Sequence, residues 1–348
     1  MKIGIITVYN SPNFGSCWQA RALYTKLIQM GHTPVMIDAG TRSVFHRIIK
    51  PSVLSISKAI VSLNIKKARF QYKRLQSFRN NYKSMKICAD MSQLDNFDIV
   101  VLGSDEIWNV DRKEMRDFPI FWGKDVVCKK ISYAPSINTA TKESLLAYGV
   151  VELLKEMAAI SVRDRWSREQ LIGLTDRNIS CVIDPTLLLE PNYYYNNFNA
   201  TDFIKGKYIA LYFFNFTEES KRLIKKIAAI MQMKIVSIGS WMDWCDYSVV
   251  DENPFIYYKN AALIITNTFH GTAFSINLSK DFICFTSGKQ KIKELLDLFD
   301  LQNRAVDGLT VDDIVSVINH NIINWDDVTG KVNKERSLSE KYLTDSLL

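Results

Sequence analysis

The sequence lacks the features that mark membrane-spanning, disulfide-stabilised and zinc-binding proteins. No apolar run approaches the roughly 18 residues that a transmembrane helix needs. The six cysteines are dispersed and form no CxxC pair, which favours reduced thiols over a disulfide framework or a zinc site. Glycine and proline are scarce, at 14 and 8 residues, so a fibrous or broadly disordered chain is not expected. We therefore expect a globular protein without a bound metal.

A secretory signal is also missing. Residues 1–8 are apolar and β-branched, but they have neither the longer apolar core nor the small-residue cleavage site of a signal peptide. They predict a first buried strand, and we expect a cytoplasmic protein. With 348 residues, 47% of them hydrophobic and 23% charged, the chain has the size and composition of a two-domain enzyme.

Residues 39–89 contain no acidic side chain and twelve basic ones. Apolar and aromatic residues are interleaved with these charges, which predicts one or two basic amphipathic helices inserted at about 42–87. The pattern is typical of a contact with an anionic membrane or a lipid diphosphate, which would place the protein peripherally at the inner face of the plasma membrane. The alternative is a solvated helical insertion. Nucleic acid is not an expected partner, because no nucleic-acid-binding module accompanies the charge.

Apolar strands alternate with helices in both halves of the chain. The expected strands lie at 2–8, 34–38, 98–102, 131–136, 160–164, 207–213, 234–238, 261–265 and 281–285. This alternation predicts an α/β protein with two Rossmann-like domains that face each other across a cleft. We assign residues 1–189 to an N-terminal domain, 190–206 to a linker, and 207–348 to a C-terminal domain.

Polar residues follow two strands of the N-terminal half. Asn10, Asn13 and Gly15 lie in a loop that leads into a helix, as an anion or sugar site would need; a plain connecting turn is the alternative. The strand at 98–102 runs into Ser104 and Asp105, which places a carboxylate at the carboxyl edge of the sheet, where ligands bind in such folds. Asp105 could act in acid–base chemistry or could cap a helix.

Arg163 ends a short apolar strand and is followed by Asp164. An arginine in this position can hold a carboxylate or phosphate with two parallel hydrogen bonds. It can equally pair internally with Asp164.

His270, one of only four histidines, lies where an apolar strand turns into a helix. Gly271 would let the turn close. The backbone N–H groups of Gly271, Thr272 and Ala273 would lie at the helix N-terminus, which favours an anion. The alternative is a histidine whose ring is satisfied by the backbone of the turn.

Together these stretches resemble the polysaccharide pyruvyl transferase family over nearly the whole chain. Val-Leu-Gly-Ser-Asp-Glu-Ile-Trp-Asn at 101–109 and Phe-His-Gly-Thr-Ala-Phe-Ser at 269–275 carry most of the resemblance. Further matching stretches lie at 10–15, 132–134, 161–164, 184–188 and 292–304. Two departures are Lys289 and Lys291, where the family often has an arginine, and Asn253-Pro254, where it often has glycine-proline.

The resemblance implies a GT-B-like fold and a transfer of the enolpyruvyl group of phosphoenolpyruvate to a sugar of a surface polysaccharide, or of its lipid-linked precursor. The product would be a pyruvate ketal, made for a capsule, exopolysaccharide or cell-wall glycan. Phosphoenolpyruvate would be the donor substrate, the acceptor would be a glycan or lipid-linked oligosaccharide, and no cofactor or metal would be needed. The first alternative is a glycosyltransferase with a nucleotide-sugar donor on the same scaffold, and the second is a non-catalytic glycan-binding partner.

Under this hypothesis His270 is the acid–base group, Arg163 holds the donor, and Asp105 orients a sugar hydroxyl or pairs with a catalytic group. Proton transfer by such a positioned group is typically worth roughly 10²–10⁴-fold in rate. The remaining expected substrate contacts are Asn10, Asn13, Gly15, Ser104, Thr268, Gly271, Thr272 and Lys289.

Overall fold

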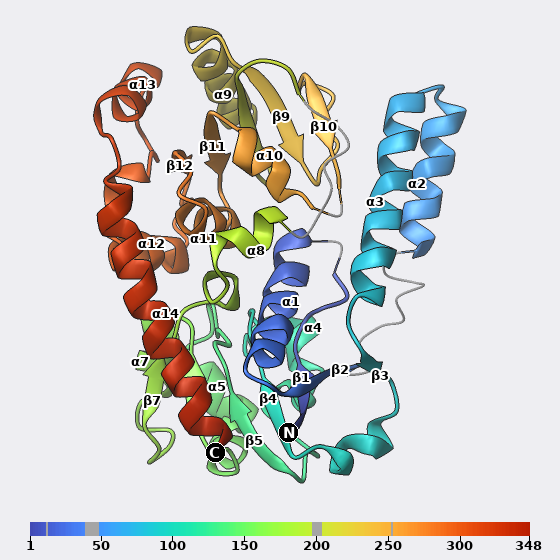
Figure 1. The fold of residues 1–348 in the computed structure, drawn as a ribbon, viewed down its shortest axis with the longest axis vertical. Helices are drawn as coiled ribbons and strands as arrows, with labels where there is room; N and C mark the ends of the chain where they lie inside the picture. Colours follow the sequence, from blue (N-terminus) through green and yellow to red (C-terminus); the bar gives the residue numbers. More distant parts are fainter. Residues whose placement is uncertain (12, 39–48, 197–203, 252) are drawn as a thin grey trace. The chain divides into compact units, whose positions relative to one another are not determined.

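The computed structural model describes residues 1–11, 13–38, 49–196, 204–251 and 253–348 (Figure 1). Its contacts divide the chain into two compact units. Unit 1 consists of Met1–Val44, Tyr82–Leu189 and Asn333–Leu348, and unit 2 of Phe45–Asn81 and Glu190–Val332. No helix in the described ranges combines the length and apolar character needed to cross a bilayer.

Unit 1 is built on a five-stranded parallel sheet with the order β3-β2-β1-β4-β5. Its strands are β1 (Lys2–Ile6), β2 (Thr33–Ile37), β3 (Ile87–Cys88), β4 (Ile99–Leu102) and β5 (Lys129–Ser132). A separate parallel pair is formed by β6 (Ile160–Val162) and β7 (Ile179–Cys181). The central strands β1 and β4 are almost entirely apolar and buried, because a parallel sheet is usually covered on both faces.

The helices of unit 1 are α1 (Phe14–Gln29), α4 (Lys113–Arg116), α5 (Lys142–Tyr148), α6 (Val150–Lys155) and α7 (Arg165–Leu171). Side chains cap the starts of α1, α5 and α7 among them. The apolar pattern of the sequence predicts this first helix from Cys17, but α1 begins at Phe14, because the Asn13 side chain caps it and accepts a 3.1 Å hydrogen bond from the Gly15 N–H. The apolar pattern of residues 143–158 predicts one helix, but the structure has two, because Gly149 adopts a left-handed conformation with φ of 85°.

Unit 2 repeats the plan with the strand order β10-β9-β8-β11-β12, again all parallel. Its strands are β8 (Tyr208–Tyr212), β9 (Lys234–Ile238), β10 (Tyr247–Val249), β11 (Leu263–Thr266) and β12 (Phe282–Cys284). Its helices are α2 (Lys50–Val61), α3 (Ile65–Lys83, which ends in unit 1), α8 (Pro191–Asn196), α9 (Glu218–Ile230), α10 (Phe255–Asn260), α11 (Phe269–Asn277), α12 (Gln290–Leu298) and α13 (Val311–His320).

The expected basic helices are present as α2 and α3, although Arg42 and Arg47 lie outside the described residues. We expected them as an insertion in the N-terminal domain, but their contacts group them with unit 2. The Ser77 hydroxyl donates a 3.0 Å hydrogen bond to the carbonyl of Asp251, and the rings of Phe70 and Trp241 meet edge to face at 5.6 Å.

The segment expected as a linker, 190–206, begins with the helix α8, and its residues 197–203 lie outside the described part of the chain. Tyr194 is fully buried in unit 2 against Phe255 and Phe274, with ring centroids at 4.7 and 5.7 Å. The aromatic residues near 193–195 therefore contribute packing to unit 2.

The last helix, α14 (Trp325–Leu347), contributes its second part to unit 1. Arg336 Nε donates to the carbonyl of Leu187 at 2.8 Å, and Ser339 Oγ accepts from the Ile183 N–H at 3.0 Å. The C-terminal residues thus complete the unit that the first strand begins.

Candidate functional site

His270 lies in the first turn of α11, directly after β11, so the expected strand–turn–helix corner is present. Its side chain is buried beside two aromatic rings, with ring centroids at 5.6 Å from Phe269 and 6.5 Å from Phe274. The residue as a whole is 7% exposed. A histidine at the carboxyl edge of a parallel sheet, buried among apolar rings, is in a position suited to acid–base chemistry.

Threonine hydroxyls hold the corner together. Thr268 caps α11, because its Oγ1 accepts a 2.9 Å hydrogen bond from the Gly271 N–H. Thr266 Oγ1 lies 3.0 Å from Thr268 Oγ1 and donates to the Tyr212 carbonyl at 2.6 Å. A Cβ on Gly271 would lie only 2.1 Å from Thr266 Oγ1, so only glycine fits at this position.

The backbone donors that we expected to receive an anion are used within the corner itself. The Gly271 N–H donates to Thr268 Oγ1, and the Thr272 N–H donates to the Thr268 carbonyl at 3.1 Å. The Thr272 hydroxyl also donates to that carbonyl, at 3.0 Å. Gly271 and Thr272 therefore shape the corner, and the features that remain to favour an anion are the helix dipole and Lys289.

Lys289 is brought to this corner from the loop after β12. Its Nζ donates a 2.7 Å hydrogen bond to the carbonyl of Asn267, the residue directly before Thr268, which caps α11. The Asn267 amide in turn bridges to the end of β8, accepting from the Phe214 N–H at 2.9 Å and donating to the Phe214 carbonyl at 2.6 Å. The ends of three strands thus meet around one cation and one histidine.

Asp307 fixes the loop that carries Lys289. Its carboxylate accepts hydrogen bonds from the Thr286 N–H and hydroxyl, both at 2.8 Å, and from the Ser287 N–H at 2.9 Å. Partial burial acts to raise the pKa of Asp307, but these hydrogen bonds outweigh it and hold the pKa below its usual value.

The expected residues of unit 1 form a second, separate group at the carboxyl ends of its strands. Asn13 and Gly15 are joined in the cap of α1, and Asn10 is 2% exposed. Ser104 is fully buried, and its hydroxyl lies 3.3 Å from Asp184 Oδ2.

Asp105 does not cap a helix, since the next helix begins only at Lys113. Its backbone has φ of 72°, and its carboxylate accepts from the Glu106 N–H at 2.9 Å. The preceding Gly103 has φ of 122°, and a Cβ there would meet the Tyr133 carbonyl oxygen at 2.2 Å. This tight packing sets the position of Asp105, whose role toward a sugar hydroxyl stays a prediction.

Arg163 has an internal partner, and that partner is Asp184 rather than Asp164. Arg163 Nη1 donates to Asp184 Oδ2 at 2.8 Å, and the two side chains are 2% and 0% exposed. Burial acts to lower the pKa of Arg163, but the carboxylates of Asp184, Asp105 and Asp164 outweigh it and raise that pKa. Asp164 instead caps α7, accepting from the Ser167 N–H at 2.8 Å. The structure therefore gives Arg163 a bridging role between strand ends, and its contact with a donor stays a prediction.

Three participants escaped the sequence analysis: Asp184, Asn267 and Asp307. Asp184 could have been found from the sequence, because a carboxylate followed by proline and threonine at a strand end is a recognisable pattern. In the structure the Asp184 carboxylate accepts hydrogen bonds from the Thr186 N–H at 3.0 Å and from the Thr186 hydroxyl at 2.7 Å. Asp307 had no such signal, because its partners lie about twenty residues earlier in the chain. Among the described residues, no group of three or more His, Cys, Asp or Glu side chains could hold a metal ion.

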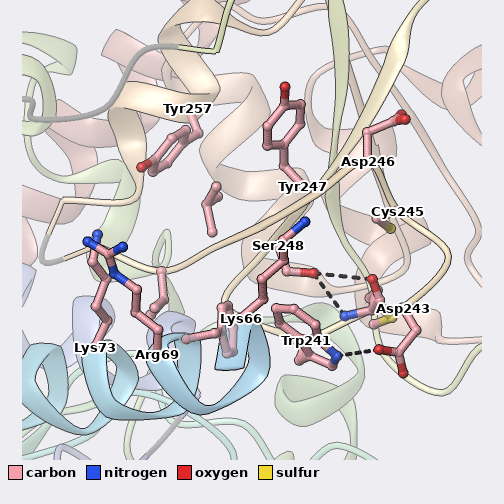
Figure 2. Close-up of a pocket in the computed structure, with 14 residues that line it drawn as sticks. Lys66, Arg69, Lys73, Trp241, Asp243, Cys245, Asp246, Tyr247, Ser248 and Tyr257 are labelled. Carbon is pink, nitrogen blue, oxygen red and sulfur yellow. Dashed lines mark hydrogen bonds between the residues drawn. The ribbon is translucent and has the colours of Figure 1, made fainter. Parts of the chain in front are cut away.

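Unit 2 also contains a pocket of about 460 Å³ between α3 and the segment from the end of β9 through β10 (Figure 2). Lys66, Arg69 and Lys73 rise from α3 on one side of it. Aromatic and acidic side chains line the remainder: Phe70, Trp241, Tyr247, Tyr257, Asp243 and Asp246. The volume and the mixture of rings with charged groups are those of a small-molecule or sugar site.

The pocket lies along β10, the outer strand of the unit 2 sheet, which is three strands away from β11 and the His270 corner. Leu211 of β8 pairs with Ser237 on one side and with Ile265 on the other. Since neighbouring strands are separated by about 4.8 Å, the end of β9 lies roughly 10 Å from the end of β11. Ser248, which lines the pocket, pairs with Ser237 from the outer side.

Comparisons with known proteins agree with this architecture. A family model described as polysaccharide pyruvyl transferase matches residues 13–289. A sequence comparison with curated proteins found no match. The structure is similar to Arabidopsis thaliana UGT89C1 complexed with UDP-L-rhamnose, with a TM-score of 0.55 and 10% identity over 99% of this chain and 98% of that one. It is also similar to UDP-GlcNAc 2-epimerase from Neisseria meningitidis bound to UDP-GlcNAc, with a TM-score of 0.54 and 8% identity over 99% and 100% of the two chains. These likenesses confirm the expected GT-B-like α/β fold.

Proposed function

The chain belongs to the polysaccharide pyruvyl transferase family, and we propose that it transfers the enolpyruvyl group of phosphoenolpyruvate to two hydroxyls of a glycan sugar. One hydroxyl adds to C2 of the donor while the methylene carbon gains a proton, and the second hydroxyl then displaces phosphate. Two C–O bonds form, the C–O bond to phosphate breaks, and the second hydroxyl proton leaves with the phosphate. The observation that carries the proposal is the family match over 13–289, which includes the whole His270 corner.

The His270 corner supports the donor half of this reaction. Phosphoenolpyruvate is strongly anionic, and the corner combines a helix N-terminus with the cationic Lys289. We assign proton transfer to and from the reacting carbon and oxygen atoms to His270, because an imidazole can both accept and donate a proton in the physiological pH range. Lysine supplies a point charge here, so the donor phosphate is attracted without a bidentate clamp.

We place the acceptor glycan in the pocket that α3 lines on one side. Sugar rings stack on aromatic side chains, and Trp241 and Tyr247 are available for this in the lining. Lys66, Arg69 and Lys73 suit an acceptor that carries phosphate or another acidic group. Three strand spacings of about 4.8 Å separate β10 from β11, so the acceptor has to span roughly 14 Å or more between this pocket and His270.

The test incubates the purified full chain with phosphoenolpyruvate and a panel of neutral and phosphorylated glycans, free and lipid-linked. We expect phosphate release that depends on the acceptor, together with a product whose mass corresponds to a ketal of pyruvate and the glycan. Phosphate release without a ketal product would overturn the transfer. Consumption of a UDP-sugar, with no turnover of phosphoenolpyruvate on any acceptor, would replace the proposal by a glycosyltransferase.

A further inference from the structure

The helices α2 and α3 form a hairpin with a well-defined turn, Ser62–Asn64, which Figure 1 draws at one end of the pair. Leu63 takes a left-handed conformation with φ of 56°. The turn is closed by backbone hydrogen bonds, from the Leu63 N–H to the Ile60 carbonyl at 2.9 Å and from the Asn64 N–H to the Ala59 carbonyl at 2.8 Å. The tip is therefore an ordered structure with a defined surface.

The surface of this tip is apolar. Val61 and Leu63 are each 84% exposed, Ile65 is 75% exposed, and Ile60 is 58% exposed. Single exposed apolar residues are common on proteins, but four branched aliphatic side chains around one turn form a contiguous patch. Such a patch indicates a surface that meets an apolar partner.

Cations surround the apolar tip. Between Lys50 and Lys83 the chain has nine basic residues and no acidic one. Lys58 precedes the tip by one helical turn, and Lys66 and Lys67 follow it in the first turn of α3. In an anionic bilayer the lipid phosphates lie just outside the acyl region. An apolar tip flanked by lysines therefore fits such a surface, with the apolar side chains deeper and the lysines level with the phosphates.

The other face of the hairpin is packed against unit 2. Ala59 and Phe70 are 3% and 4% exposed, and the Phe70–Trp241 and Ser77–Asp251 contacts tie α3 to the rest of the unit. The apolar tip is thus not the hairpin's own packing surface. A second copy of the hairpin is an unfavourable partner, because it would bring two strongly cationic segments together.

We propose that the tip formed by Ile60, Val61, Leu63 and Ile65 inserts into the head-group region of an anionic lipid bilayer, with Lys58 and Lys67 at the depth of the lipid phosphates. This docking is independent of the proposed reaction. It holds unit 2 at the membrane surface, where lipid-linked glycans are found.

The first test measures co-sedimentation of the full chain with vesicles of phosphatidylcholine alone or mixed equally with phosphatidylglycerol. We expect binding to the mixed vesicles that is about tenfold stronger than to the neutral ones and that falls in high salt. The triple variant Val61→Asp, Leu63→Asp, Ile65→Asp should bind the mixed vesicles at least about tenfold more weakly. The matched control is Ile322→Asp, which alters an 87% exposed residue elsewhere in unit 2 and should bind as the wild type does.

A second test separates charge from insertion. Lys58→Glu with Lys67→Glu should weaken binding to the mixed vesicles by about tenfold, while the exposed pair Lys226→Glu with Lys293→Glu, which changes net charge equally, should have little effect. Equal binding by the tip variant and the wild type would overturn the proposal, as would a loss of binding in the control pair as large as that in Lys58→Glu with Lys67→Glu. A tip variant that changes the sedimentation mass of the protein in solution but not vesicle binding would show that the tip contacts a second copy instead.

Discussion

His270 is the residue on which the proposed chemistry depends most directly. Replacing it by glutamine keeps a polar side chain of similar length but removes the titratable ring. We expect turnover of phosphoenolpyruvate to fall by roughly 10²–10⁴-fold, with the thermal midpoint close to that of the wild type. Phosphate release and differential scanning fluorimetry measure the two quantities. His320→Gln, at the exposed end of α13, is the matched control and should keep full activity; loss of less than about threefold in His270→Gln would remove its assigned role.

Arg163 and Asp184 form a buried ion pair, so their substitution is expected to act first on stability. Arg163→Ala leaves the fully buried Asp184 carboxylate without its cation, which typically costs about 3–5 kcal/mol. Urea denaturation followed by the fluorescence of the buried Trp108 and Trp122 measures this loss. The double variant Arg163→Met, Asp184→Leu should recover a large part of it, because no unpaired charge remains. If Arg163→Ala were as stable as the wild type but inactive, the direct donor contact would be the better interpretation.

At the scale of one element, the loop between β12 and α12 depends on the Asp307 carboxylate. Because the folded pKa is lowered, the unfolded chain binds the proton more readily, and the stabilisation by ionised Asp307 is complete above the ordinary aspartate pKa of about 3.9. It is lost as the pH falls through the lowered folded pKa. We expect Asp307→Asn to cost about 1 kcal/mol at pH 7, a modest value because the group is largely exposed.

Denaturation at several pH values tests this expectation. The difference in free energy of unfolding between the wild type and Asp307→Asn should be constant from pH 7 to about pH 5 and should shrink below pH 4. Asp297→Asn, an exposed position on α12, is the control. A difference that persists unchanged at pH 2–3 would show that the carboxylate charge is not what holds the loop.

The elements themselves were largely predictable from the sequence, because apolar runs and caps are local. The strand at Lys234–Ile238 and the helix from Glu218 follow directly from such patterns. The short edge strands β3 and β10, of two and three residues, were missed because so few residues carry no usable periodicity. The apolar pattern of residues 143–158 predicts one continuous helix, and Gly149 divides it into α5 and α6.

The candidate site was predictable only where its residues follow a strand directly, as His270 and Asp105 do. The choice of Asp184 over Asp164 as the partner of Arg163 could not be predicted, since the adjacent residue turned away to cap α7. The hydrogen bonds that the Gly271 and Thr272 N–H groups donate to Thr268 could not be predicted either. They depend on the rotamer of the Thr268 hydroxyl and on the residue at which α11 begins. Pairings between residues distant in sequence are set by tertiary packing.

At the scale of the whole molecule, the positive charge is unevenly distributed. The net charge is +7, with 44 basic and 37 acidic residues, and nine of the basic residues lie between Lys50 and Lys83. The rest of the chain is therefore slightly acidic, with 35 basic and 37 acidic residues. Attraction of an anionic partner is concentrated on the one hairpin and on the pocket that it lines.

Substitutions in this pocket test the assignment of the acceptor. Arg69→Gln and Trp241→Ala should each raise the KM for a phosphorylated glycan acceptor by about tenfold, because they remove a cation and a stacking surface, while the KM for phosphoenolpyruvate stays unchanged. Arg79→Gln, an exposed position on α3 outside the pocket, is the control. An equal rise for donor and acceptor, or no rise for either, would contradict an acceptor role.

Each unit is built from stretches of the chain that are far apart in sequence, and this affects folding during translation. Unit 1 begins with the first strand, yet it includes Asn333–Leu348, in which Leu343 and Leu347 are buried. The hairpin is synthesised early, but its partners in unit 2 follow more than a hundred residues later. Neither unit can therefore fold to completion behind the ribosome in the order of translation. The hairpin must wait for residues 190–332 before it can pack, and unit 1 is complete only after Asn333–Leu348 has left the ribosome.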